Sequence, residues 1–186
     1  MRIEDLIHRA QDGDGEAYAE AVTALNQSLY RVARAYLRSE EDIADAIQES
    51  ILHGWRDLGK LNTPAYFKTW MIRILINECI RMQRRRKQET LVDFPASYDG
   101  KEITPWMSEG KSERDEWQPG CGLEFEEMMG VLSGQTADAM VLYYGEGYTT
   151  KEISELLEIT EAAVRKRLSR GREEIRETYF RKGEAI

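Results

Sequence analysis

The stretch YTTKEISELLEITEAAVRKRLSRGR, residues 148–172, decides the fold of the C-terminal part of this chain. Thr149 is followed three residues later by Glu152, and this spacing predicts a helix start that is closed by a capping box. Apolar side chains then repeat at the i, i+3 and i+4 spacing of one helical stripe, at Ile153, Leu156 and Leu157. The stretch therefore begins with a short amphipathic helix.

The sequence after residue 157 predicts a tight turn and a second helix. Glu158-Ile159-Thr160 breaks the apolar pattern, and Thr160 can cap the helix that follows. The inward positions of this second helix are apolar: Val164, Leu168 and Ile175. Basic residues fill most of its other positions, so the layout is typical of a helix-turn-helix that enters the major groove of DNA. This stretch alone leaves a plain helical hairpin with a solvated basic face as the alternative.

The length of 186 residues allows one or two domains, and 41% of the residues are hydrophobic, which is enough for a core in each. No apolar run approaches the roughly 20 residues that span a bilayer, and the N-terminus predicts an amphipathic helix rather than a signal peptide. We therefore expect a soluble, cytoplasmic protein.

The formal net charge of −8 argues against indiscriminate binding of nucleic acid, because non-specific affinity needs clustered positive charge. The positive charge is local, with one block over residues 81–87 and another over residues 165–176. The rest of the chain is acidic. This distribution suits a protein that meets DNA at two places and is otherwise repelled by it.

The positions of the cysteines and histidines argue against a zinc site and against a structural disulfide. Cys79 lies in an apolar helical segment and is expected to be a packed thiol, whereas Cys121 lies in a glycine-rich segment and is expected to be exposed. There is no CxxC pair, and His8 and His53 are isolated, so we expect neither a zinc site nor a structural disulfide. No Ser/His/Asp arrangement or phosphate loop is visible, so we expect no enzyme activity, no cofactor and no small-molecule substrate.

Four helices are predicted before residue 88. The first carries apolar residues over 3–10 and ends at the DGDG turn of residues 12–15, and the second runs from about 16 to 38. The third is capped by Ser39, with Asp42 at the box position. Its predicted inward residues repeat every four positions: Ile43, Ile47, Ile51 and Trp55. After a turn over residues 58–62, Thr63 caps the fourth helix and Pro64 opens it.

The buried face of the fourth helix is predicted at Phe67, Trp70, Met71, Ile74 and Leu75. Residues 88–122 then lose the periodicity and hold most of the prolines and an excess of acids, which predicts an extended or disordered linker. Its aromatic residues can dock onto a domain or a partner: Phe94, Tyr98, Trp106 and Trp117. Helices resume over about 123–132 and 136–144. The chain is thus predicted to be all-α, with two small helical domains, 1–87 and 123–186, joined by the linker.

Three segments resemble the signatures of one known family. Residues 42–55, DIADAIQESILHGW, resemble D-x-x-D-[LA]-x-Q-[ED]-x-[FI]-[LI]-x-x-W, and residues 67–77, FKTWMIRILIN, resemble F-x-x-W-[LM]-x-R-I-x-x-N. Residues 148–157 resemble Y-x-E-I-A-x-[LI]-L, and residues 164–172 resemble V-[KR]-x-R-L-x-R-[AG]-R, which follows it in the family. Together and in this order, they resemble a bacterial sigma-70 family factor of the extracytoplasmic-function (ECF) group over nearly the whole chain.

The resemblance implies a promoter-specificity subunit rather than an enzyme. Such a subunit binds the β′ clamp and β flap of core RNA polymerase, places the enzyme at a minus-35/minus-10 promoter and helps to melt the DNA. It implies a linker that threads the catalytic cleft and RNA exit path, with a solvated spacer as the alternative, and often an anti-sigma partner. Two other functions stay open: a stand-alone helix-turn-helix regulator that binds DNA as a dimer, and a helical adaptor that binds only proteins.

One face of the third helix is implied to bind the polymerase. Asp42, Asp45 and Glu49 fall at i, i+3 and i+7, which predicts an acidic stripe opposite the apolar one, with Gln48 beside it. By resemblance this face docks on a basic coiled coil of the polymerase clamp. Charge complementarity would chiefly give association rate and orientation. A solvated acidic face is the alternative.

The turn over residues 58–66 corresponds to the family's loop that captures a minus-ten base after it leaves the stack. A pocket for a flipped base offsets the cost of opening the duplex. The residues that could supply charge, hydrogen bonds and a stacking ring are Lys60, Asn62 and Tyr66. An ordinary helix connection is the alternative. A track for the promoter backbone and upstream minus-ten bases is implied along the fourth helix at Arg73, Asn77, Arg81 and Arg84, although many relatives have Asp in place of Arg81.

The second helix of the helix-turn-helix is implied to contact the minus-35 element. The residues at its start that should approach the bases are Thr160, Glu161, Ala162 and Ala163. Those that follow along the groove are Arg165, Lys166, Ser169 and Arg170, and the sequence does not divide them into base and phosphate contacts. Arg167 can instead pair with an acid inside the domain. Residues 135–140 replace a segment where relatives often have Pro and Arg, which would remove a phosphate contact and weaken minus-35 binding.

Overall fold

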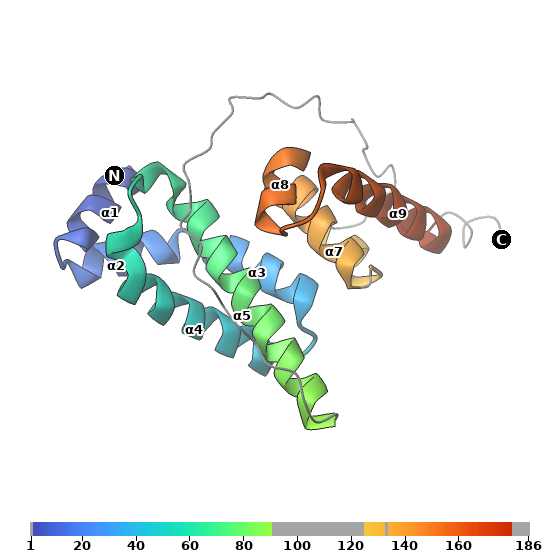
Figure 1. The fold of residues 1–186 in the computed structure, drawn as a ribbon, viewed down its shortest axis with the longest axis horizontal. Coiled ribbons are helices and arrows are strands. Elements are labelled where there is room, and N and C mark those ends of the chain that lie inside the picture. The colour runs from blue at the N-terminus through green and yellow to red at the C-terminus, as the bar shows by residue number, and fades with distance from the viewer. Residues whose placement is uncertain (1, 91–124, 133, 180–186) are drawn as a thin grey trace. The chain divides into compact units, whose positions relative to one another are not determined.

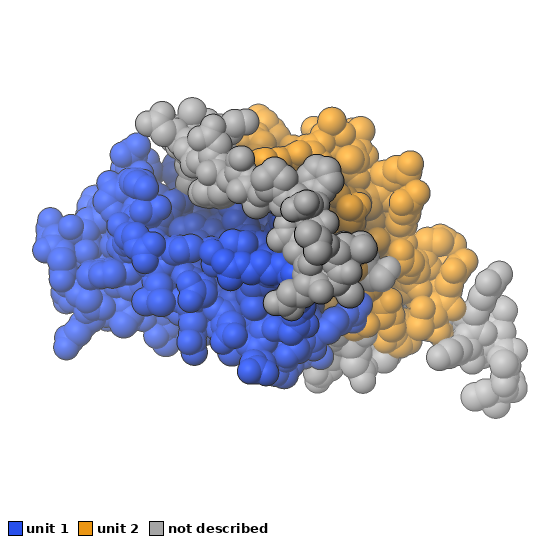
Figure 2. Space-filling view, turned by 60° about the horizontal axis from the view of Figure 1, so that its bottom comes forward, with its two compact units in different colours: residues 1–109 blue, residues 110–186 orange. Residues whose placement is uncertain are grey.

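The computed structural model describes residues 2–90, 125–132 and 134–179 (Figure 1). Every regular element in these ranges is a helix, which confirms the all-α prediction. The chain divides into two compact units, residues 1–109 and 110–186, coloured blue and orange in Figure 2.

Most of the predicted linker lies outside the described residues, and the predicted domain limits of 1–87 and 123–186 stay predictions. The same holds for the expectations about Cys121 and about the four linker aromatics: Phe94, Tyr98, Trp106 and Trp117. Within the described ranges, we find no helix with the length and apolar character that crossing a bilayer requires.

The first unit is a bundle of α-helices with two 3-10 turns. In chain order its elements are α1 (Ile3–Gln11), α2 (Gly15–Thr23), α3 (Asn26–Tyr36), α4 (Glu40–Asp57), η1 (Leu58–Lys60), η2 (Pro64–Tyr66) and α5 (Phe67–Thr90). Helix α5 packs against both α3 and α4, and α1 packs against α2 and against both 3-10 turns. Pro64 opens η2, which leads directly into α5, but Thr63 makes no side-chain cap bond, so that part of the prediction is wrong. The predicted face of α5 is buried except at Ile74.

The single helix predicted over residues 16–38 is wrong, because the structure has two helices, α2 and α3, with a break at Ala24 and Leu25. The Thr23 hydroxyl donates a hydrogen bond of 2.7 Å to the carbonyl of Ala19. Such bonds from threonine back to the preceding turn bend helices. Leu25 is buried at the break, so the change of direction also places an apolar side chain in the core.

Helix α4 begins as predicted but buries a different face. The Asp42 N–H donates to the Ser39 hydroxyl at 3.5 Å, which confirms the cap. Of the predicted inward residues only Ile43 is buried; the others are Ile47 and Ile51, which are half-buried, and Trp55, which is 41% exposed. The buried face instead consists of Asp42, Ile43, Ala46, Ser50 and Gly54.

Close packing explains why the small residues of α4 face inward. A Cβ at position 54 would lie 2.5 Å from the Tyr18 hydroxyl oxygen and 2.6 Å from the Met71 sulfur, so this position requires glycine unless both side chains move. The Tyr18 hydroxyl donates a hydrogen bond of 2.8 Å to the carbonyl of Ile51. The Trp55 ring also packs against Tyr18, with 5.1 Å between the ring centroids. Helix α4 therefore meets its neighbours close to its backbone.

The second unit contains α6 (Phe125–Gly130), α7 (Gln135–Met140), the π-helical turn η3 (Val141–Gly145), α8 (Thr150–Leu156) and α9 (Glu161–Tyr179). Together α7 and η3 form the helix predicted over residues 136–144. Helix α9 packs against both α7 and α8. It crosses α7 at Gly171, where a Cβ would lie 2.6 Å from Met140 Cγ and 2.9 Å from Thr136 Cγ2. The largest fully buried side chains of this unit are Leu132, Met140, Leu142 and Ile153.

Candidate nucleic-acid and polymerase interfaces

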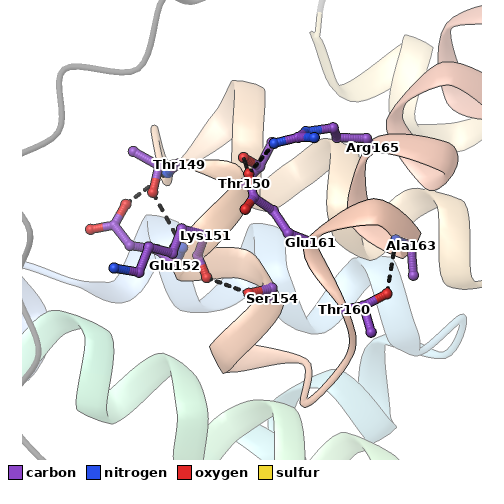
Figure 3. A network of polar contacts seen from close by, with 9 residues as sticks. All are labelled: Thr149, Thr150, Lys151, Glu152, Ser154, Thr160, Glu161, Ala163 and Arg165. Carbon is purple, nitrogen blue, oxygen red and sulfur yellow. Dashed lines mark hydrogen bonds and ion pairs between the residues drawn. The ribbon is translucent and has the colours of Figure 1, made fainter.

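The helix-turn-helix begins at a capping box, as predicted (Figure 3). The Glu152 N–H donates to the Thr149 hydroxyl oxygen at 3.2 Å, and the Thr149 N–H donates to the Glu152 carboxylate at 2.7 Å. Two backbone donors that the helix itself cannot satisfy are thus satisfied by side chains. Ile153 and Leu156 point into the core, whereas Leu157 is half-buried at the helix end.

A turn over residues 157–160 connects α8 to α9. Glu158 adopts a left-handed backbone with a φ of 53°, which ends α8, and the Ile159 N–H donates to the carbonyl of Ser154 at 3.0 Å. The Ala163 N–H donates to the Thr160 hydroxyl at 3.2 Å, so Thr160 caps α9 as predicted (Figure 3). Val164, Leu168 and Ile175 are buried, which confirms the predicted inward face of α9.

The outward face of α9 gathers most of the residues that the sequence assigned to the minus-35 element. The exposed ones are Thr160, Ala162, Arg165, Lys166, Ser169 and Arg170. Glu161 and Ala163 are half-buried. This surface therefore offers three cations and two hydroxyls on one helix, and such side chains can reach both phosphates and base edges in a major groove.

Glu161 joins the two helices of the helix-turn-helix, a role that the sequence analysis missed. The Thr150 hydroxyl of α8 and the Arg165 guanidinium of α9 both donate to Glu161 Oε1, at 2.7 Å and 2.6 Å (Figure 3). The Thr150 hydrogen bond, followed by that of Arg165, lowers the pKa of Glu161 below its ordinary 4.5. The i, i+4 spacing of Glu161 and Arg165 was the available sequence signal.

Arg167 is not part of this outward face. Its guanidinium lies 3.1 Å from a carboxylate oxygen of Asp138 in α7, and both side chains are largely buried. This confirms the expectation that Arg167 pairs with an acid inside the domain. The acid comes from residues 135–140, the segment that departs from the family signature. Another cation of α9, Arg172, donates a hydrogen bond of 3.2 Å to the Tyr144 hydroxyl of η3.

In the first unit, the candidate base-capture turn over residues 58–66 exposes two of its three predicted binding side chains. Lys60 and Asn62 are exposed, and the Lys60 ammonium lies 3.0 Å from a carboxylate oxygen of Asp57. Tyr66 is half-buried in η2. A residue that the sequence analysis missed, Gln11 of α1, donates from its side-chain amide to the carbonyls of the turn. No periodicity or motif pointed to this contact, because it joins positions far apart in sequence.

The predicted track along α5 is only partly exposed. Arg84 is exposed, whereas Arg73 and Asn77 are half-buried. Arg81 forms an ion pair with the buried carboxylate of Glu78, and Nδ1 of His53 lies 2.7 Å from the same carboxylate. Glu78, which no sequence pattern pointed to, links α5 to α4 through His53, whereas Arg81 belongs to α5 itself.

The acidic face of α4 is shorter than predicted. Asp45, Gln48 and Glu49 are exposed, but Asp42 lies on the buried side, and its carboxylate is 2.6 Å from the Arg86 guanidinium of α5. The prediction of one stripe opposite the apolar face is therefore wrong at Asp42. The exposed acids instead share α4 with two exposed apolar side chains, Leu52 at 58% and Trp55 at 41%.

Each of the two units contains a segment that matches the model of a known protein family. Residues 21–89 match the family described as Sigma-70 region 2, and residues 122–175 match Sigma-70, region 4. The first match runs from the end of α2 through most of α5, and the second covers α8 and most of α9.

Two curated relatives illustrate the similarity in sequence. The chain is 31% identical over 185 residues to the probable RNA polymerase sigma factor RfaY of Xanthomonas campestris pv. campestris. The aligned region covers 95% of this chain and 43% of that protein. The chain thus spans less than half the length of this relative. It is 26% identical over 184 residues to the ECF RNA polymerase sigma factor SigW of Bacillus subtilis, with 95% of this chain and 96% of that protein covered.

Two solved structures share the fold. CnrH, in a complex with the cytosolic domain of CnrY, matches with a TM-score of 0.60 and 19% identity, over 93% of this chain and 94% of that chain. The sigma factor RpoE of Bartonella quintana, in a complex with the anti-sigma factor NepR, matches with a TM-score of 0.61 and 18% identity, over 86% of this chain and 94% of that chain.

Proposed function

Because the chain belongs to the sigma-70 family of RNA polymerase sigma factors, we propose that three of its surfaces divide the work of promoter recognition and initiation. Helix α9 contacts the minus-35 element, the turn over residues 58–66 with α5 contacts the minus-10 element, and α4 docks on core polymerase. The observation that carries this proposal is the doubly capped helix-turn-helix, whose outward face gathers Arg165, Lys166 and Arg170.

The minus-35 contact follows from the chemistry of α9. An arginine can donate two hydrogen bonds to O6 and N7 of guanine in the major groove, whereas lysine acts as a point charge towards base or phosphate. Arg165 lies one turn after the start of α9, where recognition helices contact base edges. We therefore assign base contact to Arg165, and phosphate contact to the cations further along, Lys166 and Arg170.

The minus-10 contact uses the exposed groups between α4 and α5. Lys60 and Asn62 offer a charge and an amide, and Tyr66 offers an aromatic ring. Stacking on an aromatic ring stabilises an unstacked base by about 1–3 kcal/mol, which offsets part of the cost of opening the duplex. Arg84 of α5 is exposed and contacts the promoter backbone, and Arg73, Asn77 and Arg81 continue this track.

The polymerase contact uses the exposed side of α4. Asp45, Gln48 and Glu49 supply charge and polar groups for a basic coiled coil of the β′ clamp, while Leu52 and Trp55 add apolar area. Tryptophan near the centre of an interface commonly contributes a large part of its binding energy. Asp42 contributes only indirectly, because it is buried and paired with Arg86. The second unit contacts the β flap.

The chain has no catalytic role of its own in this proposal, and it acts in the cytoplasm, where the polymerase carries out all chemistry. An anti-sigma partner that covers α4 and α9 would hold it inactive. The two solved structures that share the fold support such a partner, since CnrH is in a complex with the cytosolic domain of CnrY, and RpoE is in a complex with the anti-sigma factor NepR.

A run-off transcription assay with core polymerase and a pool of genomic promoter fragments tests the proposal. Wild-type protein should give new start sites, and the double variant Asp45→Arg/Glu49→Arg should give none, because it reverses two charges of the docking face. The matched control is Glu16→Arg/Glu20→Arg, which makes the same charge change at two exposed positions of α2 and should leave the start sites unchanged.

Two outcomes would contradict the proposal. If the wild type neither binds core polymerase nor gives new starts, but binds DNA alone, the stand-alone regulator becomes the better explanation. If charge reversal at Arg165 and Arg170 leaves every activity unchanged, the protein-binding adaptor becomes the better explanation.

A further inference from the structure

The turn between α4 and η2 is held in place by a residue of α1. Gln11 is the last residue of α1, and its side-chain amide nitrogen donates to the carbonyl oxygens of Leu58 at 3.1 Å and Leu61 at 2.8 Å. Both acceptors are carbonyls, so the nitrogen of the amide, and not its oxygen, must face them. One side chain thus binds both ends of the 3-10 turn η1.

Gln11 completes a set of constraints on this turn. The Leu58 carbonyl also accepts the Leu61 N–H at 3.1 Å, which closes the 3-10 turn. The side chains of Leu58 and Leu61 are both buried. The two leucines and the amide of Gln11 therefore fix the backbone on either side of Gly59 and Lys60.

The groups assigned to base capture lie between and directly after these fixed points. Lys60 precedes the buried Leu61, and Asn62 follows it, and both are exposed. The direction of their side chains therefore depends on the backbone that Gln11 binds. A binding group must be held within about 0.5 Å of its productive position by the residues around it to be effective.

We infer that Gln11 is a positioning residue for minus-10 recognition, which holds the turn in the shape that presents Lys60 and Asn62 to an unpaired base. This inference rests on the proposed role of the turn in base capture. Gln11 itself needs no contact with DNA. It acts through the two carbonyls that it binds.

The chemistry of the amide gives a sharp set of variants. Gln11→Glu keeps the shape of the side chain but replaces the donor with a carboxylate that only accepts, so it repels both carbonyls. Gln11→Lys restores a donor at a similar reach and should recover the wild-type behaviour in part. Gln27→Glu is the matched control, because it makes the same change at an exposed position of α3.

The experiment measures base preference and not only activity. Holoenzyme is assembled from each variant, and run-off transcription is compared on promoters that carry each of the four bases at each minus-10 position. A promoter with 2-aminopurine at the preferred position reports the unstacking of that base. Affinity for core polymerase and the thermal unfolding curve are measured alongside.

We expect Gln11→Glu to reduce the preference between the best and the worst base by about tenfold, since two hydrogen bonds that fix the turn are lost. The unstacking signal should fall with it, while core affinity stays within twofold of the wild type. Gln11→Ala, which removes the donor without adding repulsion, should change the preference in the same direction by a smaller factor. Gln27→Glu should match the wild type.

The double variant Lys60→Ala/Asn62→Ala separates failure of this inference from failure of the proposed function. If the double variant loses the base preference and a folded Gln11→Glu protein keeps it, Gln11 does not position the turn. If the double variant keeps the preference, the turn does not capture a base, and both the proposed minus-10 contact and the role of Gln11 are wrong. A uniform loss of transcription on all promoters, in parallel with lost core affinity, would assign Gln11 a role in folding alone.

Discussion

Arg167 of α9 and Asp138 of α7 form an ion pair with 3.1 Å between nitrogen and oxygen, and only 19% and 7% of the two side chains are exposed. The pair connects α9, the second helix of the helix-turn-helix, to α7, which packs against it. Asp138 belongs to the segment in which this chain departs from the family signature. Residues 135–140 differ from the family in a way that would remove a phosphate contact, but they supply Asp138 as an internal partner for Arg167.

Removing one member of this pair should destabilise the second unit. Arg167→Met leaves the Asp138 carboxylate buried without its cation, which typically costs about 3 kcal/mol. Thermal unfolding followed by circular dichroism measures the change. Arg170→Met is the matched control, because it makes the same substitution at an exposed position of the same helix and should change stability by less than about 0.5 kcal/mol. Equal effects of the two variants would mean that the pair adds nothing.

The crossing of α7 and α9 should not accept a side chain at position 171. Gly171→Ala would place a Cβ 2.6 Å from Met140 Cγ and 2.9 Å from Thr136 Cγ2, and such overpacking costs about 1–3 kcal/mol. The free energy of unfolding in urea measures it. Gly130→Ala, in the same unit, meets no atom within 4 Å and should be neutral or slightly stabilising. A Gly171→Ala protein as stable as the wild type would show that Met140 moves aside freely.

The Thr150 hydroxyl should control the acidity of Glu161. The pKa of Glu161 lies below its ordinary 4.5 chiefly because of this hydroxyl, and secondly because of Arg165. Carbon-13 NMR of the Glu161 carboxylate should therefore show a higher pKa in Thr150→Val than in the wild type. Because the folded-state pKa is depressed, the network stabilises the fold fully above pH 4.5, and this contribution is lost as the pH falls through the lower folded value. An unchanged pKa in Thr150→Val would rule out the hydroxyl as the main cause.

Breaking the same network should loosen DNA discrimination. Glu161→Gln removes the negative charge beside Arg165, so affinity for random DNA should rise, and the slope of log affinity against log salt concentration should steepen by up to about one unit. Preference for the cognate minus-35 sequence should fall, because the direction of the Arg165 side chain is no longer fixed. Filter binding of holoenzyme to cognate and scrambled promoters measures both quantities. Ser169→Ala, further along α9, should leave the salt slope unchanged, since it alters no charge.

Cys79 should be inert in the folded protein. It is fully buried in α5, as predicted, and burial raises the pKa of its thiol to about 12. At pH 8 the thiolate fraction is then on the order of one in ten thousand, and only the thiolate reacts with alkylating reagents. In a Cys121→Ser background, iodoacetamide should label Cys79 only after unfolding in urea. Rapid labelling of the native protein would mean that the helices around Cys79 open readily.

Local signals in the sequence predicted the parts of the fold that local chemistry determines. The capping box of Thr149 and Glu152, the cap at Thr160 and the inward stripe of α9 all depend on neighbours a few residues away. Their spacing is therefore visible in the sequence itself.

The predictions are wrong or incomplete where tertiary packing or contacts between distant residues determine the structure. In α4 the large residues favoured one face, but the approach of Tyr18 and Met71 selects the face that carries Gly54. The break between α2 and α3 has no proline or glycine to mark it. The binding of the turn by Gln11 joins residues about fifty positions apart, for which a single sequence holds no periodic signal.

The small side chains on the buried face of α4 also limit how this helix can move. With Ala46, Ser50 and Gly54 directed inward, little side-chain volume separates its backbone from its neighbours, so a shift of α4 cannot be absorbed by a change of rotamer. The helix is therefore stiff along the length that carries its exposed acids and Trp55. A partner that binds there meets a helix backbone already in place, so association costs little backbone conformational entropy.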